Sequence, residues 1–385
     1  MGKTAVVVGG GIGGLAAAIG LRRIGWEVTV VERAPTLEDA GAGISLAANG
    51  LRALDELGVG EAVRDASRGQ YSGGTRTPEG ARLVRMDGAV LEKAVGTPIM
   101  GIPRSTLHRL LCEALPTEAL LIGSEASLVG QIAPGTVRVR CGDKVLDADL
   151  VVAADGIGSK VRGLLFPAHP GPVYSGSTVL RAITEQAVEL RTDFELTWGR
   201  GAEFGHIAFR DGRAEWHAVL NLPAGTRFPD PLAELRRRFQ DWHDPIRALL
   251  DATRPAAVLH HDVREIRTPL PSYTVGRIAL LGDAAHAMTP NLGQGACQAL
   301  EDAITLAAAL ATEPTVEAAL ARYDAERRPR SQAVARAARH AGRMGGQLAH
   351  PLAVTLRNTA MRLTPSRAAA RMILRHHAWV PPQLH

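Results

Sequence analysis

The sequence has few cysteines and few aromatic residues. Its three cysteines, Cys112, Cys141 and Cys297, are far apart and form no CxxC pair. This spacing excludes a disulfide framework and a structural zinc site, and it favours a reducing compartment, so we expect a cytoplasmic protein. Aromatic residues make up 4% of the chain, whereas 41 of its 385 residues are glycine. We therefore expect a core packed through small aliphatic side chains and close backbone contacts.

Charge is absent between Thr4 and Leu21, which suggests a signal peptide or a membrane span. Six of these 18 residues are glycine, however, and five of the six lie between Gly9 and Gly14. Each glycine destabilises a helix by roughly 1 kcal/mol relative to alanine. The segment is therefore unsuited to the apolar helix that either interpretation requires, and we predict no transmembrane segment here.

Acidic residues are absent from the C-terminal region. Eleven arginines and no Asp or Glu lie between Arg327 and His385, although the net charge of the chain is only +5. By subtraction (5 minus 11), the rest of the chain carries −6. Such a segment can dock on the acidic remainder of its own chain, or it can attract nucleic acid or anionic lipid. Because no nucleic-acid-binding motif accompanies it, we favour docking and predict no nucleic-acid partner.

A strand, a glycine turn, a helix and a second strand follow one another in residues 4–31. Gly9, Gly11 and Gly14 form a GxGxxG motif in this unit, and Glu32 follows the second strand. In a dinucleotide site the three glycines provide a tight turn, an approach for the pyrophosphate and close helix packing, while the acid accepts from ribose hydroxyls. The pattern predicts such a site rather than a merely structural turn, and the acid favours FAD or NAD over NADP.

Two later strands also end at an acid next to a glycine. Asp155 follows the apolar strand DLVVA at 149–153, and Asp283 follows the apolar segment RIALL at 277–281. A glycine-rich run then begins a long helix. Because parallel strands end at one edge of a sheet, we expect the three strand ends to face one cofactor-sized crevice.

Asp283 has a nearby histidine, His286, and the pair has three interpretations. It could be a catalytic pair, a fragment of a metal site, or part of a pocket for a hydroxyl-bearing cofactor. A metal site needs three or four ligands, and no further ligand lies nearby in the sequence, so we predict no metal.

Between these motifs the pattern changes from α/β to alternating β structure punctuated by turns. We expect a mixed α/β (α+β) fold in which a Rossmann-like domain is interleaved with an antiparallel-sheet domain. The first comprises residues 1–70, 98–170 and 262–330, the second comprises 71–97 and 171–261, and a helical segment follows at 331–385.

The clearest hairpin turns at Arg210-Asp211-Gly212. A two-residue loop and a three-residue loop with a left-handed glycine give opposite cross-strand parity. The three-residue loop sorts the two faces better, so we favour it. It assigns His206 to an apolar face and groups Glu203, Ile207, Glu215 and His217 on a polar face, which we expect to lie toward the substrate. The apolar face would also contain Phe204, Ala208, Ala214, Trp216, Ala218 and Leu220.

Taken together, these motifs resemble the class A FAD-dependent monooxygenases of the para-hydroxybenzoate hydroxylase fold. The matching segments are GGGIGG with Glu32-Arg33, GAGI at 41–44, Arg104 in IPRSTL, ADGIGSKVR, and GRIALLGDAAHAMTPNLGQGA followed by LEDA. They span nearly the whole chain. The sequence looks most like the single-component enzymes related to salicylate, 3-hydroxybenzoate, 6-hydroxynicotinate and urate hydroxylases. It lacks the thioredoxin-like C-terminal domain of the phenol hydroxylase type.

The resemblance implies noncovalent FAD, held by the glycine motif with Glu32 and Arg33. Asp283 would hydrogen-bond a ribityl hydroxyl, Arg104 would contact the cofactor, and Asp155 would lie near the pyrophosphate. The residues Gly293, Gln294, Gly295 and Ala296 would present a helix N-terminus to the flavin N1/C2 carbonyl edge and stabilise the reduced flavin.

On the same resemblance His286 is structural. NADH or NADPH would be a transient donor because no second GxGxxG exists.

The resemblance implies hydroxylation of a small aromatic or heteroaromatic substrate with molecular oxygen, through a flavin C4a-hydroperoxide. An epoxidase of an isoprenoid or polyketide is an alternative that uses the same intermediate, and a non-catalytic FAD-binding or partner-docking protein is the alternative of another class. The halogenase signature WxWxIP is absent. The sequence leaves open whether the protein is a monomer or a homodimer.

The substrate would lie between the flavin and the polar face of the sheet. His217 is then the candidate base, because neutral imidazole accepts a proton near pH 7, although a hydrogen-bonded sheet histidine explains it equally well. Glu215 lies on the same face. Arg181 in TVLRAIT could receive a carboxylate or enolate, or form a surface ion pair.

Overall fold

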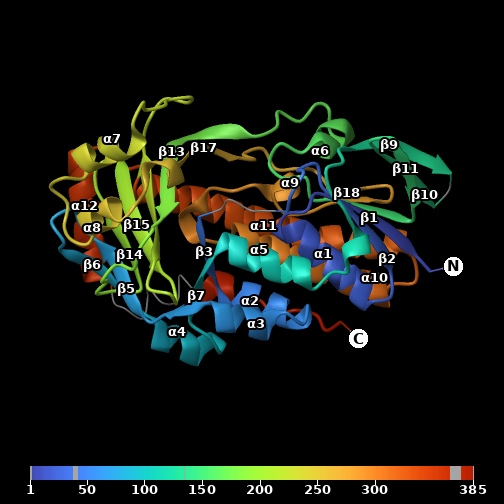
Figure 1. The fold of residues 1–385 in the computed structure, drawn as a ribbon, viewed down its shortest axis with the longest axis horizontal. Coiled ribbons are helices and arrows are strands. Elements are labelled where there is room, and N and C mark those ends of the chain that lie inside the picture. The colour runs from blue at the N-terminus through green and yellow to red at the C-terminus, as the bar shows by residue number, and fades with distance from the viewer. Residues whose placement is uncertain (1, 38–41, 134, 365–373, 385) are drawn as a thin grey trace.

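The computed structural model describes residues 2–37, 42–133, 135–364 and 374–384. A six-stranded sheet organises the half of the molecule that contains the N-terminus, with strands in the order β18-β19-β12-β1-β2-β8 (Figure 1). All neighbours in it are parallel except β18 and β19. These strands are β1 (Thr4–Val8), β2 (Glu27–Val31), β8 (Leu120–Leu121), β12 (Leu150–Ala153), β18 (Thr274–Val275) and β19 (Ile278–Leu280).

This register aligns the strand ends that precede the three motifs. Val8 on β1 is the partner of Ala153 on β12, and Ala153 is the partner of Leu280 on β19. The glycine loop after β1, Asp155 after β12 and Asp283 after β19 therefore lie at the same edge of the sheet.

Close packing by small residues places α1 (Ile12–Arg23) against the sheet and against α10 (Gly295–Thr312). A Cβ at Gly13 would lie 2.8 Å from Leu281 Cδ2, and a Cβ at Gly20 would lie 3.2 Å from the Cβ of Ala307. The abundance of glycine and alanine thus has the packing role that composition predicted. The other helices of this half are α2 (Ala48–Glu56), α3 (Gly60–Ala66), α5 (Arg104–Glu113), α6 (Lys160–Leu165) and α9 (Asp283–His286).

Two three-stranded sheets accompany this half. One has the order β3-β7-β4 and carries Gly43 and Ile44 of the GAGI motif, of which Gly41 lies outside the described residues. The strands are β3 (Gly43–Leu46), β4 (Arg68–Gln70) and β7 (Ile99–Pro103) in this sheet, and β9 (Ala126–Ala133), β10 (Thr136–Cys141) and β11 (Lys144–Ala148) in the other.

A seven-stranded sheet forms the second large unit, in the order β17-β13-β16-β15-β14-β5-β6. It is antiparallel except between β14 and β5. One face is covered by α7 (Pro231–Arg238) and α8 (Ile246–Asp251), which share a buried apolar cluster with it. Its strands are β5 (Ser72–Arg76), β6 (Arg82–Asp87), β13 (Val173–Ile183), β14 (Phe194–Trp198), β15 (Ala202–Ala208), β16 (Ala214–Leu220) and β17 (Leu259–Glu265), and α4 (Gly88–Val95) follows β6.

The hairpin of β15 and β16 has the three-residue loop. Ala208 pairs with Ala214, and the backbone N–H of Phe209 donates to the carbonyl of Arg213 at 2.8 Å, so residues 210–212 form the turn. Gly212 has a φ of +83°, the left-handed conformation that this loop requires. The predicted faces follow from this register, and His206 lies with Trp216 on the apolar face.

The arginine-rich region forms α11 (Val316–Met344) and α12 (Pro351–Leu363). A division of the chain at residue 330 would fall inside α11, which is one continuous helix. Several of its arginines dock on the body of the protein, as the charge distribution favoured: Arg327 and Arg330 bind Glu301 on α10, and Arg339 binds Glu265 on β17. No helix in the described ranges is long and apolar enough to cross a membrane.

Candidate active site

The glycine motif leaves the N-terminus of α1 accessible. Gly9 has a φ of +109°, and a Cβ there would collide with the carbonyl oxygen of Ala154. A Cβ at Gly14 would collide with the carbonyl oxygen of Gly9. Gly11, by contrast, is the N-cap of α1 and faces open space. The first and third glycines thus allow tight packing, and the second lies where an anionic group can reach the helix N-terminus.

Glu32 supports this loop from the next strand. Its Oε2 accepts from the backbone N–H of Gly10 at 2.7 Å, and its Oε1 accepts from that of Ala34 at 2.8 Å. Each carboxylate oxygen has two lone pairs, so acceptor capacity remains beyond these bonds. Arg33 beside it is exposed.

Only one of the two carboxylate oxygens of Asp155 has hydrogen-bond partners among the described residues. Its Oδ2 accepts from the backbone N–H groups of Lys160 at 2.9 Å and Val161 at 3.3 Å, at the beginning of α6. Its Oδ1 is buried and accepts no hydrogen bond from the described residues. A buried carboxylate oxygen without a partner is costly, which points to a donor that a ligand would supply.

Arg162 joins the second and third motifs, a role that the sequence did not indicate. Its Nη1 donates to the carbonyl of Ala284 at 2.9 Å, and its Nη2 donates to the carbonyl of Ile157 at 2.6 Å. The buried guanidinium therefore fixes the loop after β12 relative to the loop after β19. Only the folded chain brings these loops together, so no local pattern could reveal this contact.

Asp283 begins α9 and is open to solvent, although protein surrounds it closely enough to affect its charge. Desolvation raises the pKa of Asp283 above its ordinary value, and the nearby His286, Arg104 and Arg162 oppose that rise. Within the described part of the chain its carboxylate accepts no hydrogen bond. Asp283 is thus an available acceptor at the edge where the three strands end.

The N-terminus of α10 is a second open helix end. Gln294 is its N-cap, Gly293 has a φ of +60°, and Gly295 faces open space. The Oε1 of Gln294 accepts from Asn49 Nδ2 at 2.9 Å. The Nε2 of Gln294 and the Oδ1 of Asn49 are buried and lack partners among the described residues. Ala296, in the first turn, is half-buried.

A buried ionic network joins α9 to α10. The Nε2 of His286 binds Asp302 Oδ2 at 2.6 Å, and the backbone N–H of Gly282 donates to the same oxygen at 2.9 Å. Burial alone would raise the pKa of Asp302, but His286 and Arg327 outweigh it and hold the pKa below its ordinary value. His286 therefore pairs with Asp302, which fits the structural role implied for it.

The polar face of the seven-stranded sheet brings together the three candidate catalytic residues. Arg181 on β13 is the direct cross-strand partner of His217 on β16. The Nδ1 of His217 lies 3.2 Å from Glu215 Oε2, and its Nε2 lies 3.8 Å from Glu203 Oε1. Burial would lower the pKa of His217, but the two carboxylates outweigh burial and the nearby Arg181 and raise it. The Nε of Arg181 is buried and has no partner among the described residues.

Close backbone packing positions this face against the GAGI strand. A Cβ at Gly205 would collide with the imidazole of His217, and a Cβ at Gly43 on β3 would lie 2.6 Å from the Cβ of Glu215. The polar face is therefore turned toward β3, whose strand belongs to the half that carries the three motifs. Glycine at 205 leaves the room that the histidine ring occupies.

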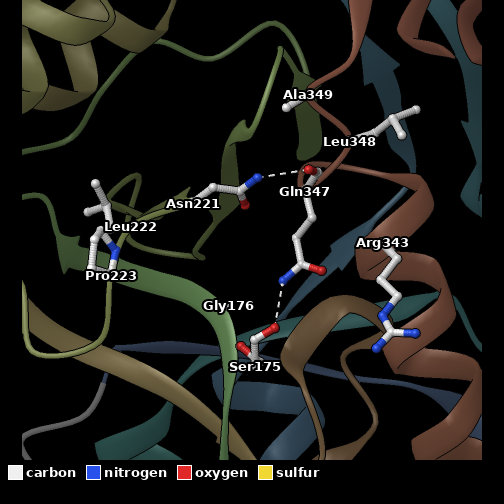
Figure 2. Close-up of a pocket in the computed structure, with 9 residues that line it drawn as sticks. All are labelled: Ser175, Gly176, Asn221, Leu222, Pro223, Arg343, Gln347, Leu348 and Ala349. Carbon is white, nitrogen blue, oxygen red and sulfur yellow. Dashed lines mark hydrogen bonds between the residues drawn. The ribbon is translucent and has the colours of Figure 1, made fainter.

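A pocket of about 510 Å³ lies beside this face, between β13, the end of β16 and the segment after α11 (Figure 2). Gln347 crosses it, donating from Nε2 to Ser177 Oγ at 2.5 Å and accepting at its backbone carbonyl from Asn221 Nδ2 at 2.8 Å. Glu203 borders this region, because a Cβ at the neighbouring Gly346 would lie 2.7 Å from its Cβ. Glu203, which the sequence placed on the same face as His217, is thus a second carboxylate beside the imidazole, at 3.8 Å from its Nε2.

The residues at the strand edge fit FAD. An open helix N-terminus at Gly11 suits a pyrophosphate, Asp283 is an available acceptor for a hydroxyl, and Gln294 Nε2 is an unused donor beside the N-terminus of α10. These groups combine anion-binding and hydroxyl-binding chemistry along one edge of a parallel sheet, as a dinucleotide site requires.

Comparison with known proteins agrees with this geometry. Residues 3–338 match the model of the FAD binding domain family. The chain is 37% identical over 368 residues to the aurachin C monooxygenase/isomerase of Stigmatella aurantiaca, covering 95% of each protein. It is 34% identical over 388 residues to the 2-heptyl-3-hydroxy-4(1H)-quinolone synthase of Pseudomonas aeruginosa, covering 96% of each. The fold matches that of Klebsiella pneumoniae HpxO complexed with FAD and uric acid, with a TM-score of 0.90, 25% identity and coverage of 99% of this chain and 97% of the other.

The chain therefore belongs to the FAD binding domain family. Within it, the protein is a FAD-dependent monooxygenase with the fold of the class A hydroxylases. The predicted fold class, cofactor and enzyme class are confirmed. The roles of the individual site residues and the division into domains stay predictions.

Proposed function

We propose that this enzyme hydroxylates a nitrogen-containing heteroaromatic ring, bound between FAD and the polar face of the seven-stranded sheet. One observation carries the proposal: the buried Nε of Arg181 has no partner among the described residues, and it lies on the strand directly beside His217. A buried unsatisfied guanidinium donor is costly, so a ligand acceptor is the natural partner. A ring carbonyl or enolate oxygen has the required charge and geometry.

His217 is the proposed base for the same ring. Glu215 binds its Nδ1, which leaves Nε2 to accept a proton from a ring N–H or hydroxyl. Loss of that proton raises the electron density of the ring, and Arg181 stabilises the negative oxygen that results. FAD, once reduced by NADH or NADPH, supplies the activated oxygen from molecular oxygen. The residues of the chain bind, orient and deprotonate the substrate.

The names of two relatives support the substrate class. One is a 2-heptyl-3-hydroxy-4(1H)-quinolone synthase, whose product name contains a ring N–H, a ring carbonyl and an added hydroxyl. In this proposal His217 deprotonates the ring N–H and Arg181 stabilises the ring oxygen. The other relative is named a monooxygenase/isomerase. Epoxidation, the alternative that uses the same activated oxygen, is the second outcome that product analysis must distinguish.

The cofactor contacts are part of the proposal. We place the FAD pyrophosphate at Gly11 with Asp155 nearby, a ribose at Glu32, the ribityl chain at Asp283 and the flavin carbonyl edge at residues 293–296. Arg33, next to Glu32, and Arg104, near Asp283, would also contact the cofactor. We also propose a cytoplasmic location and a monomer or homodimer, in keeping with free cysteines at 112, 141 and 297.

The test is a substrate panel that compares 4-quinolones, hydroxybenzoates and purines. Consumption of NADH and NADPH is measured with each compound, with hydrogen peroxide in parallel and the product structure determined. The proposal requires that one nitrogen heterocycle stimulates consumption and is converted to a hydroxylated product. Arg181→Gln should raise KM strongly for that compound, whereas Arg181→Lys should recover part of the affinity. Stimulation only by carbocyclic hydroxybenzoates, or unchanged kinetics in Arg181→Gln, refutes it.

A further inference from the structure

The helix α12 has an unusual distribution of apolar side chains. It is 13 residues long and lies at the end of the molecule opposite the N-terminus (Figure 1). Its buried residues are Val354 and Arg357, so the charged arginine faces the protein. Leu352, Leu356 and Leu363 face outward and are 71%, 71% and 77% exposed.

These three leucines form one stripe, which we call the leucine stripe. They are separated by four and seven residues, and at 100° per residue they fall within an arc of about 40°. Thr355 and Thr359 are also exposed on this side. A surface helix of a globular protein normally turns its apolar stripe inward. Here the stripe points away from the protein that the helix packs against.

The charge around the stripe is positive. The sequence of α12 contains no acid, and none occurs from Arg327 to the end of the chain. Arg362 lies on α12 and is exposed, and Arg343, also exposed, precedes the helix and borders the pocket of Figure 2. Glu79 is the acid near Arg362, and Arg200 also acts on that carboxylate. Two exposed arginines, Arg362 and Arg200, thus lie near one exposed acid, Glu79.

The arginines of this region divide into two groups. Arg327, Arg330 and Arg339 bind buried carboxylates of the protein. Arg343 has no ion pair within the described ranges, and Arg362 lies on α12 itself. The leucine stripe of α12 is not covered by other described residues. Docking on the protein body thus accounts for Arg327, Arg330 and Arg339 of α11 but not for the outer face of α12.

We propose that the leucine stripe of α12 docks on an anionic lipid surface, with the helix axis parallel to the membrane. The leucines would enter the boundary between headgroups and acyl chains, while Arg362 and the nearby Arg200 remain at the level of the phosphates. An amphipathic helix with exposed leucines and neighbouring arginines is suited to this interface, and it holds the enzyme at the membrane without spanning it. The proposal is independent of the substrate assigned above.

The test is sedimentation of the FAD-loaded enzyme with vesicles. Vesicles of phosphatidylcholine alone are compared with vesicles of phosphatidylcholine and phosphatidylglycerol, at low and high salt. We expect partition into the anionic vesicles, reduced by salt because screening weakens exposed charge interactions beyond about 10 Å at 0.1 M. The triple variant Leu352→Gln, Leu356→Gln, Leu363→Gln should lower the partition coefficient by roughly tenfold or more. Arg362→Glu should lower it less.

A matched control changes three other exposed apolar residues: Ile122→Gln, Val145→Gln and Leu164→Gln, which are 45%, 52% and 61% exposed. This variant should sediment like the wild type. FAD absorbance and the melting temperature verify that both triple variants are folded. Equal sedimentation with both kinds of vesicle, or an unchanged α12 variant, overturns the proposal. So does light scattering that shows a dimer which the α12 variant dissociates, because the stripe would then join two copies of the chain.

Discussion

Arg327 on α11 donates from Nε to Oδ1 of Asp302 on α10 at 2.7 Å, and both side chains are buried. The other oxygen of Asp302 binds His286 and the backbone of Gly282, so the arginine acts through one carboxylate on the loop that carries Asp283. The C-terminal helices are therefore mechanically connected to the FAD edge of the sheet.

Arg327→Met should lower the free energy of unfolding by about 3–5 kcal/mol, because it removes one cationic partner from each of two buried carboxylates. Among the described residues, only His286 would remain as an ionic partner of Asp302, and only Arg330 as that of Glu301. Urea denaturation followed by circular dichroism measures this loss. Arg328→Ala is the matched control: its partner Asp324 is a partly exposed i,i+4 acid, so the expected cost is below about 1 kcal/mol. Equal losses for the two variants would show that the buried network contributes no special stability.

Asp283→Ala should weaken FAD binding by roughly ten- to a hundredfold, since a hydrogen bond to a charged group is typically worth about 1.5–3 kcal/mol. The apoprotein should keep its stability. Desolvation raises the pKa of this carboxyl, which means that the folded apoprotein disfavours its charged form and loses nothing when it is removed. Flavin fluorescence titration and thermal melting test the two statements. Unchanged FAD affinity in a folded variant would assign Asp283 a structural role.

His217→Ala should retain FAD and its reduction by NAD(P)H but lose roughly 10²- to 10⁴-fold in hydroxylation, the usual contribution of a general base. The reducing equivalents should appear as hydrogen peroxide. His206→Ala is the control on the opposite face, where its Nε2 contacts Thr192 and the ring is buried. The ratio of product to NAD(P)H consumed is the measurement. Uncoupling in His206→Ala alone would exclude His217 as the base.

Hydroxylation should increase with pH through an inflection above 6.5, the ordinary value for histidine. Glu215 and Glu203 raise the pKa of His217, and they outweigh the opposing effects of burial and Arg181. The imidazolium therefore persists to a higher pH, and the neutral imidazole that acts as the base forms only above this raised pKa. Glu215→Gln removes one negative neighbour and should shift the inflection to lower pH. The pH profile of kcat/KM for both proteins is decisive, and an inflection that stays in place would mean that another group titrates.

The geometry at the edge where β1, β12 and β19 end could be predicted from the sequence because its features are local. A glycine that must adopt a positive φ, such as Gly9, or a helix N-terminus that must remain open, such as Gly11, appears in the residue types themselves. The hairpin register was predictable for the same reason, since the loop at 210–212 fixes which residues pair.

The contacts that escaped prediction join residues that are distant in the chain. Arg162 reaches Ala284 across 122 positions, and Asn49 reaches Gln294 across 245. In neither case does the sequence around one residue indicate which residue it contacts. Glu203 and His217 lie on neighbouring strands, and parity alone placed them on one face. Their spacing of 3.8 Å, which affects the charge of the histidine, depended on the side-chain packing around Gly205 and Gly346.

The strand order of the six-stranded sheet has a consequence for how the enzyme is made. Its adjacent strands β1, β12 and β19 begin at residues 4, 150 and 278, and the helix whose N-terminus completes the edge begins at residue 295. During synthesis on the ribosome, the edge remains incomplete until more than three quarters of the 385 residues have emerged. FAD can therefore bind to its complete site only late in synthesis. A nascent polypeptide arrested before Gly295 lacks the N-terminus of α10 and so lacks the complete edge.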